Sequence, residues 1–362
     1  MRRQFPRTIK KIVVKVGSSL IATYTMKPKL AQLSSLVEQI CEIRKKGIEV
    51  VLVSSGAVVL GMGELDLEKR PAELAQIQAA AAIGQGILMK TYNDFFHKYG
   101  GLCGQVLLTW EDFDNRLRYN NARSTLQAML KWGAVPVVNE NDTISTDEIK
   151  FGDNDKLSAL VACLVEADLL LILSDVEGLY DLNSEEKKIF EEIKEVTKEI
   201  EGLASGTTKK HMAKGGMSAK LEAVKIVAQA KIPCVIAHGE TENVLLRVLD
   251  GEKIGTLFVE KEEKLLARKH WISFGAKPKG ILTIDDGAKK ALVEGGKSLL
   301  LPGVVSWQGH FAKDDVVVVR DKQDVEIARG VVNYSTAELE KIEDRKGKIE
   351  AIHRDNLVLA ER

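Results

Sequence analysis

Apolar runs rich in Val and Ile alternate with longer stretches of helical periodicity along the first two thirds of the chain. The runs have the length of buried strands; one begins at Lys11 and others span 48–53, 104–108, 135–138, 168–173, 232–237 and 255–259. The stretches between them place apolar residues on one helical face, as in 28–46, 72–96, 121–131 and 157–164. This alternation predicts an α/β fold with a mostly parallel open sheet and helices on both faces.

The pattern changes near residue 260. Residues 260–269 are highly charged and carry no strand pattern, so we predict a linker between a first domain at 1–260 and a second at 270–362. In the second domain, short strand candidates are separated by Gly and Asp turns; they lie at 280–284, 304–307, 316–320 and 327–332. The second domain is therefore predicted to be small and β-rich. Within the first domain, residues 184–201 are dense in Lys and Glu and predict a solvated helical face.

Composition and charge narrow the class of protein. The 362 residues are 45% apolar, which is enough for a sizeable core, and 52 Lys and Arg balance 52 Asp and Glu, so no net charge draws the whole chain to nucleic acid or membrane. The four cysteines are scattered, which argues against a zinc site or a disulfide framework. The sequence shows no signal peptide and no apolar stretch long enough to span a bilayer. We therefore expect a soluble, cytoplasmic protein.

The most informative stretch follows the apolar run at 135–138. An Asn-Glu-Asn-Asp sequence at 139–142 ends that run, and a second polar cluster at 150–156 precedes a helical pattern. In open α/β sheets, ligands bind beyond the carboxyl ends of the strands, so this pattern predicts a strand, a substrate loop and a helix start. An acidic surface loop has a similar composition and is the alternative interpretation.

Lys15 lies inside the first apolar run, where an ammonium group is costly unless it is paired or functional. The Gly-Ser-Ser turn at 17–19 supplies backbone N–H groups of the kind that hold phosphate. The alternative is an edge strand whose lysine faces water.

Three more polar segments fall at strand ends or before a helix. Small and hydroxyl-bearing residues at 54–57 follow one strand and allow a ligand to approach the backbone, although an ordinary turn has the same composition. Another polar cluster, at 174–180, follows the strand at 168–173. Residues 214–220 place two glycines and a lysine at the start of a helical pattern, which predicts an anion cradle; a flexible Gly-Gly loop is the alternative.

Six segments, in this order and at these spacings, resemble the motifs of the amino acid kinase family: 14–19, 53–57, 139–142, 151–159, 174–180 and 215–220. The second domain resembles a PUA domain, so the resemblance covers nearly the whole chain. It implies an ATP-dependent kinase, with Mg²⁺, that phosphorylates the γ-carboxylate of L-glutamate in the first step of proline synthesis. Related kinases act on aspartate, N-acetylglutamate, carbamate or UMP, and an RNA-binding role of the second domain is a further alternative.

The resemblance also implies roles for individual residues. Lys15 and Lys220 would contact the phosphates of ATP, and Asp155 would orient both lysines. Ser55, Asp142 and Asn154 would hold glutamate, with Asp142 on the α-ammonium group and the other two on the carboxylates. Ser174 and Asp175 match a nucleotide-contacting pair. The remaining nucleotide contacts would come from Lys214, Gly215, Gly216, Met217, Ser218 and Ala219, where Lys214 replaces the family's usual threonine.

The implied chemistry needs no catalytic base, because a carboxylate nucleophile is already ionised at neutral pH. The difficulty is to bring that anion to a polyanionic phosphate, which explains the need for two lysines and Mg²⁺. The resemblance further implies proline as a feedback inhibitor and a homo-oligomer. RNA binding is disfavoured by charge, because residues 270–362 hold 15 Lys and Arg against 15 Asp and Glu.

Overall fold

The computed structural model describes Arg3, Phe5, Ile272 and residues 8–145, 154–181, 188–206, 216–259, 278–342 and 349–360. The chain divides into two compact units. One comprises Met1–Asp112 and Arg116–Lys264, and the other comprises Leu265–Arg362 with Phe113–Asn115. The predicted linker at 260–269 lies outside the described residues, so the domain boundaries at 260 and 270 stay a prediction.

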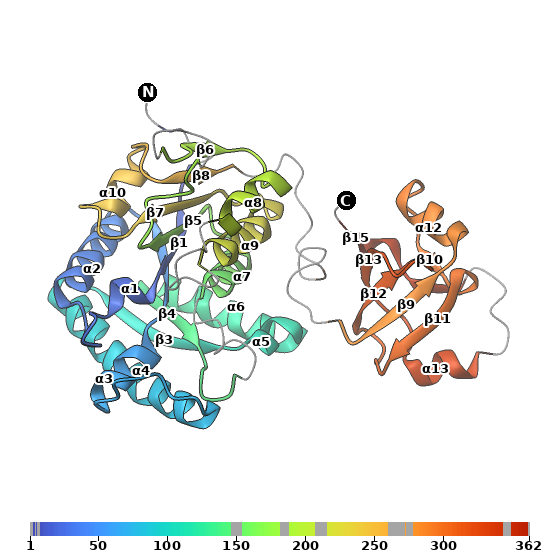
Figure 1. The fold of residues 1–362 in the computed structure, drawn as a ribbon, viewed down its shortest axis with the longest axis horizontal. Coiled ribbons are helices and arrows are strands. Elements are labelled where there is room, and N and C mark those ends of the chain that lie inside the picture. The colour runs from blue at the N-terminus through green and yellow to red at the C-terminus, as the bar shows by residue number, and fades with distance from the viewer. Residues whose placement is uncertain are drawn as a thin grey trace. The chain divides into compact units, whose positions relative to one another are not determined.

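Among the described residues, the first unit is built on an eight-stranded sheet (Figure 1). In spatial order its strands are β3 (Leu102–Leu108), β4 (Ala134–Glu140), β2 (Glu49–Ser54), β1 (Lys11–Val16), β5 (Leu169–Ser174), β7 (Cys234–His238), β8 (Thr256–Phe258) and β6 (Glu192–Ile193). Neighbouring strands run parallel except β8, which is antiparallel to β7. The predicted mostly parallel sheet is confirmed.

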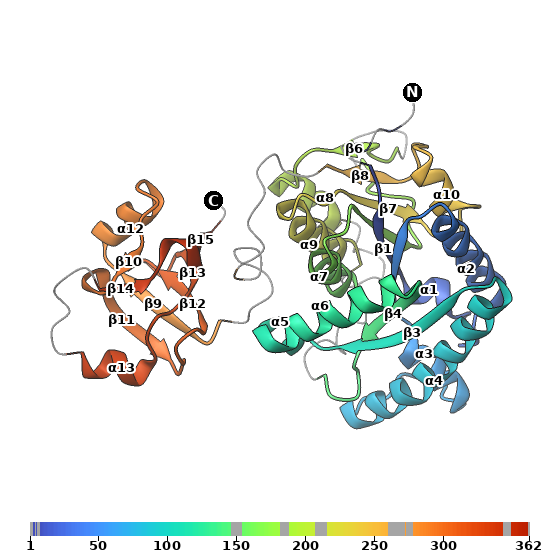
Figure 2. The same ribbon diagram turned by 180° about the vertical axis from the view of Figure 1, so that it is seen from behind.

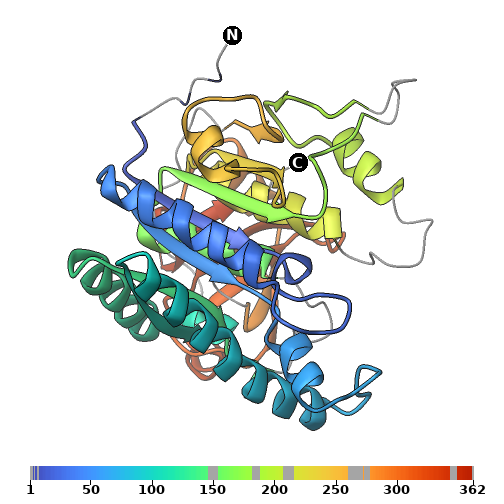
Figure 3. The same cartoon turned by 90° about the vertical axis from the view of Figure 1, so that its left-hand side faces the viewer.

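Helices cover both faces of this sheet, as predicted. The core on one face contains residues of α2 (Leu30–Lys45), α4 (Leu74–Lys98) and α10 (Val244–Leu249). The other face carries α6 (Arg116–Lys131), α7 (Asp155–Val165) and α9 (Gly216–Gln229), and Figure 2 shows these from behind. Figure 3 shows α2 lying across the first face. The remaining described helices of this part of the chain are α1 (Ser18–Ile21), α3 (Ala57–Glu64), α5 (Trp110–Asp114) and α8 (Lys198–Gly206).

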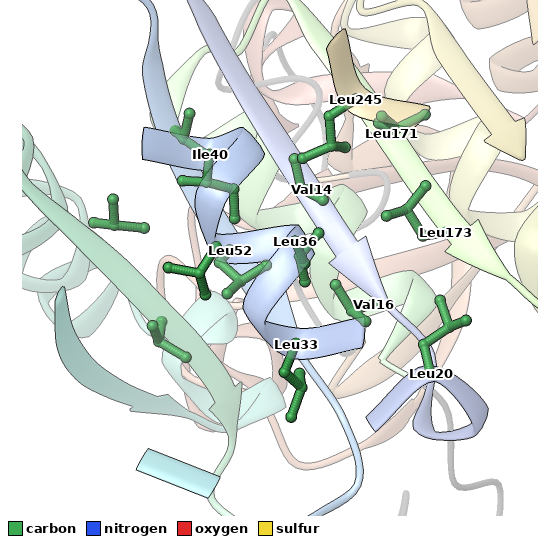
Figure 4. Packing of buried hydrophobic residues seen from close by; sticks show 14 of the residues in the cluster. Val14, Val16, Leu20, Leu33, Leu36, Ile40, Leu52, Leu171, Leu173 and Leu245 are labelled. Carbon is green, nitrogen blue, oxygen red and sulfur yellow. The ribbon is translucent and has the colours of Figure 1, made fainter. Parts of the chain in front are cut away.

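The side chains of strand β1 point alternately to the hydrophobic core and to a buried polar cluster. Successive side chains of a strand point to opposite faces, so Val14 and Val16 pack into the core against α2 (Figure 4). Lys15 points to the opposite face, where it meets Asp155 at the start of α7. Since β1 lies between β2 and β5, this lysine is only 1% exposed. The alternative of an edge strand with a solvated lysine is wrong.

Helices α3 and α4 pack unusually closely, and glycine makes this possible. A Cβ at Gly84 would lie 1.8 Å from the carbonyl oxygen of Ala57, and a Cβ at Gly61 would lie 1.8 Å from that of Ala80. Helix α4 runs unbroken from Leu74 to Lys98, so Gly84 serves close packing.

The predicted helical face at 184–201 is wrong for residues 188–197, while 182–187 lie outside the described residues. Ile189 forms a bridge with Tyr180, Glu192–Ile193 is the short strand β6, and helix α8 begins only at Lys198. Ile193 is 6% exposed and pairs with Phe258 of β8. Burial of this one apolar side chain in the sheet outweighs the local helix propensity of the Lys and Glu residues around it.

The second unit is β-rich, as predicted. Its five-stranded sheet has the order β11 (Val304–Gly309), β9 (Gly280–Ile284), β12 (Val316–Arg320), β13 (Glu326–Val331) and β15 (Leu357–Leu359), and β10 (Leu299–Leu300) pairs with β14 (Glu350–Ile352). Helices α12 (Asp286–Val293) and α13 (Thr336–Lys341) complete it, and the latter starts with a capping box. The four predicted strands are confirmed; β10, β14, β15 and both helices were not predicted.

Within the described ranges, no helix has the length and apolar character that a membrane span requires.

Candidate active site

The carboxyl ends of six parallel strands meet at one edge of the sheet. Val16 at the end of β1 pairs with Ser54 of β2 and Leu173 of β5, Leu108 of β3 pairs with Glu140 of β4, and Ser174 pairs with His238 of β7. This register gathers the polar segments at 54–57, 139–142 and 174–180, which lie far apart in the sequence. Such an edge is the usual ligand site of an open α/β sheet.

Two lysines from different elements converge on one carboxylate beside this edge. Nζ of Lys15 lies 2.6 Å from Oδ1 of Asp155, and Nζ of Lys220 lies 3.2 Å from Oδ2. Asp155 is the first residue of α7 and is fully buried, while Lys220 is 5% exposed. Nζ of Lys220 also donates to the carbonyl oxygen of Gly216, one turn earlier in α9, at 3.0 Å. The structure thus brings together the three residues that the sequence predicted as catalytic.

The cluster places two ammonium groups against one carboxylate, and ammonium groups held in this way suit an anionic ligand. Burial of an unpaired ammonium group is costly, and the shared carboxylate offsets that cost for both lysines. Three groups held this tightly are preorganised: they need little rearrangement to meet a negatively charged ligand.

The predicted anion cradle at 214–220 is described only in part. Lys214 and Gly215 lie outside the described residues. Gly216, Met217, Ser218, Ala219 and Lys220 begin α9, and the first N–H groups of a helix have no partner within the helix itself. The helical start that the sequence predicted here is present.

Ser55 lies in the loop between β2 and α3. It is 5% exposed, and its Oγ has no hydrogen-bond partner in the described part of the chain. Gly56 beside it has a φ of +93°, and a Cβ there would lie 2.8 Å from the side chain of Ile21. Only glycine fits this turn without strain, and the turn holds a buried hydroxyl at the sheet edge.

A chain of buried side-chain amides links the strand ends to α4. Nδ2 of Asn154 donates to the carbonyl oxygen of Ser54 at 2.5 Å and to Oδ1 of Asn139 at 2.6 Å. Nδ2 of Asn139 donates to Oε1 of Gln85 at 2.7 Å. Sequence reasoning placed Asn139 in the motif without a role and missed Gln85, which lies beside Gly84 in α4.

Two carboxylates lie near each other beyond β4. Glu140 is buried and accepts a hydrogen bond from the hydroxyl of Ser145. Burial first, and then the charge of Glu140, raise the pKa of Asp142 to about 7, while Arg70 opposes this shift. A carboxyl group in this state gains from an incoming cation, because an ammonium group would offset both the burial and the repulsion.

Ser174 and Asp175 end β5 at the same edge. Oγ of Ser174 donates to Oδ1 of Asp175 at 3.0 Å, and the backbone N–H of Gly239 donates to the carbonyl oxygen of Ser174 at 2.8 Å. The carboxylate of Asp175 is exposed. It is an oxygen ligand of the kind that Mg²⁺ accepts, directly or through water, when the ion arrives with a nucleotide. Among the described residues, no three His, Cys, Asp or Glu side chains gather as a metal-binding set.

Comparison with protein families matches both units. The model of the amino acid kinase family matches residues 10–238, and that of the PUA domain matches residues 280–355.

Curated relatives match the chain over nearly its whole length. Glutamate 5-kinase of Caldanaerobacter subterraneus subsp. tengcongensis is 48% identical, covering 97% of this chain and 98% of the relative. Glutamate 5-kinases of Gloeobacter violaceus and Carboxydothermus hydrogenoformans are 46% and 43% identical, covering 96% and 99% of this chain. These matches agree with the order of motifs in the sequence and with the lysine–carboxylate cluster in the structure.

Proposed function

Because the chain belongs to the amino acid kinase family, we propose that it transfers the γ-phosphoryl group of ATP to the γ-carboxylate of L-glutamate, as the names of its relatives indicate. The observation that carries this proposal is the convergence of Lys15 and Lys220 on Asp155. Residues 1–260 would form the kinase domain and 270–362 the PUA domain.

In this reaction the two lysines bind the phosphates of ATP and neutralise charge. Phosphoryl transfer requires positioning and charge stabilisation more than covalent help from the protein. As the phosphoryl group moves, its oxygens meet the incoming carboxylate, and the ammonium groups of Lys15 and Lys220 offset the repulsion between the two anions. No proton has to be removed from the nucleophile.

Asp155 positions the two lysines and does not touch the phosphoryl group. Each of its oxygens holds one ammonium group, so the two cations stay at a fixed separation.

Glutamate binding is assigned to Ser55, Asp142 and Asn154. The carboxylate of Asp142 pairs with the α-ammonium group and selects an amino acid over a plain diacid, because an unpaired buried carboxylate is costly. The hydroxyl of Ser55, buried without a partner in the described part of the chain, donates to a substrate carboxylate.

Nucleotide binding is assigned to Ser174, Asp175 and the segment from Lys214 to Lys220. The N–H groups in the first turn of α9 suit the phosphates. Mg²⁺ would screen the charge of the phosphates, and the exposed carboxylate of Asp175 could help to hold it, directly or through water. Lys214 adds a cation where relatives of this family usually have threonine.

Glutamate-dependent release of ADP from Mg-ATP tests the proposal. The purified chain is expected to release ADP with L-glutamate and not with aspartate, N-acetylglutamate, carbamate or UMP. Proline is expected to lower the rate as a feedback inhibitor, and gel filtration is expected to show a homo-oligomer. Release of ADP with one of the other acceptors, and none with glutamate, would reassign the substrate.

A further inference from the structure

The chain of amides that joins α4 to the sheet edge has a defined direction, because a backbone group of fixed polarity lies at each end. The backbone N–H of Glu140 donates to Oδ1 of Asn139 at 2.9 Å. The carbonyl oxygen of Ser54 accepts from Nδ2 of Asn154 at 2.5 Å. A backbone N–H cannot accept and a backbone C=O cannot donate, so neither asparagine can be turned over without loss of a bond.

This direction determines which atom of Asn154 is left for a ligand. The Nδ2 group of Asn154 has two protons, and these go to Ser54 and to Oδ1 of Asn139. Only Oδ1 of Asn154 remains for a substrate. An amide oxygen accepts hydrogen bonds, so it suits an ammonium group and does not suit a carboxylate.

The same reasoning gives Gln85 a place in this arrangement. Since Oδ1 of Asn139 takes the bonds from Glu140 and Asn154, its Nδ2 must donate elsewhere, and Oε1 of Gln85 accepts it at 2.7 Å. Gln85 is 9% exposed. Its own Nε2 has no hydrogen-bond partner in the part of the chain that the structure describes, a cost that a glutamine kept only for stability would avoid.

We propose that Gln85 is a positioning residue that, through Asn139, makes Asn154 present its oxygen to the α-ammonium group of the substrate. Asp142 and Asn154 then recognise the ammonium group together, in place of the carboxylate contact expected for Asn154 from the sequence. Gln85 thereby helps the site to prefer an amino acid over a dicarboxylate that lacks the amino group. This inference rests on the proposed function.

The test compares L-glutamate with glutarate, which has both carboxylates and no ammonium group. Glutarate is measured as an acceptor and as a competitive inhibitor, so that its affinity is known even without turnover. In Gln85→Met, Asn139 loses its acceptor and can relieve the loss only by rotating away from Asn154. The KM for glutamate is expected to rise about tenfold while the affinity for glutarate and the kcat change little.

Two further variants distinguish a positioning role of Gln85 from a contribution to stability alone. Gln85→Glu keeps an oxygen for Asn139 and is expected to retain the preference for glutamate. Gln39→Met removes another buried glutamine, on α2, whose Oε1 accepts from the backbone N–H of Leu245 at 3.0 Å. It is expected to lower the melting temperature without changing the preference. Gln85→Ala, with room for water, replaces Gln85→Met if the latter does not fold.

An equal loss of affinity for glutamate and glutarate in Gln85→Met would overturn the inference, as would the same loss in Gln85→Glu. Either result would leave the kinase assignment intact, because that depends on glutamate-dependent ADP release by the unaltered chain. Absence of that release would instead count against the proposed function.

Discussion

Nζ of Lys15 lies 2.6 Å from Oδ1 of Asp155, and both side chains are almost completely buried. Lysine and aspartate side chains are rarely buried so completely unless they are paired, because both ions lose their hydrating water. The pair shares its carboxylate with Lys220, so two ammonium groups meet at one carboxylate. Under the proposed function, an ATP phosphate would bind both ammonium groups.

Asp155→Asn should lower kcat by about 100-fold, because an amide has one acceptor oxygen and cannot orient two ammonium groups. Loss of the partner of a buried ion pair also destabilises a fold by about 3–5 kcal/mol, so kcat is measured below the melting temperature of the variant. Asp94→Asn, on the exposed face of α4, is the matched control and should leave both quantities unchanged. A kcat above half that of the unaltered chain would remove Asp155 from its assigned role.

Lys220→Met should lower kcat by about 100-fold or more while the fold is kept, since methionine fills the space but carries no charge. Lys225→Met on the same helix removes a more exposed lysine that pairs with Glu201, and it should have a near-normal kcat. Steady-state kinetics with saturating glutamate and ATP make the comparison. Similar values for both variants would contradict the role of Lys220.

The pH dependence of kcat/KM for glutamate should report Asp142, whose pKa is about 7 in the free protein. Only the ionised carboxylate pairs with the α-ammonium group, so kcat/KM should fall by about tenfold per unit of pH below 7. Asp142→Asn should raise the KM for glutamate and abolish this slope, with little effect on the KM for ATP. A raised KM for ATP alone would contradict the assignment.

The same carboxyl group should make stability depend on pH. Its pKa is near 3.8 when exposed and about 7 in the fold, so the folded protein disfavours the ionised form. The resulting cost appears as pH rises above about 4 and is complete above about 7. Asp142→Asn should therefore stabilise the protein by ~1 kcal/mol at pH 8 and not at pH 4. Equal melting temperatures of both proteins at pH 8 would speak against the shift.

Alanine substitutions at two glycines of α4 test the close contact between α3 and α4. Gly84→Ala places a Cβ 1.8 Å from the carbonyl oxygen of Ala57 and should destabilise the fold by about 1–3 kcal/mol. Gly86→Ala meets no atom within 4 Å and should stabilise the helix by about 0.5–1 kcal/mol. Thermal unfolding of both variants measures the difference. Equal effects would mean that the helices separate easily.

Local patterns in the sequence were enough to predict the sheet and Lys15. A lysine inside a β-branched run is conspicuous, and parallel strands bring their ends together by geometry alone. The motif order also predicted Asp155 and Lys220. Gln85 could not be found in this way, because an Ala- and Gln-rich helix does not reveal which of its polar residues faces the sheet.

Tertiary contacts explain what the sequence did not show. Helix α3 contains Gly61 and Gly63, which have low helix propensity, and its packing on α4 compensates. Around Ile193, a Lys- and Glu-rich stretch favours a helix locally, yet pairing with Phe258 makes it a strand. In both places a partner distant in the sequence decides the structure.

Strand β1 precedes the other described strands in the sequence but lies inside the finished sheet, between β2 and β5. Until the ribosome has produced β5, one side of this β-branched strand has no partner, and nascent chains are prone to aggregate through such edges. The ion pairs of Lys15 also form late, because Asp155 and Lys220 are synthesised much later than β1. Nucleotide turnover should therefore begin only when nearly the whole kinase unit has left the exit tunnel.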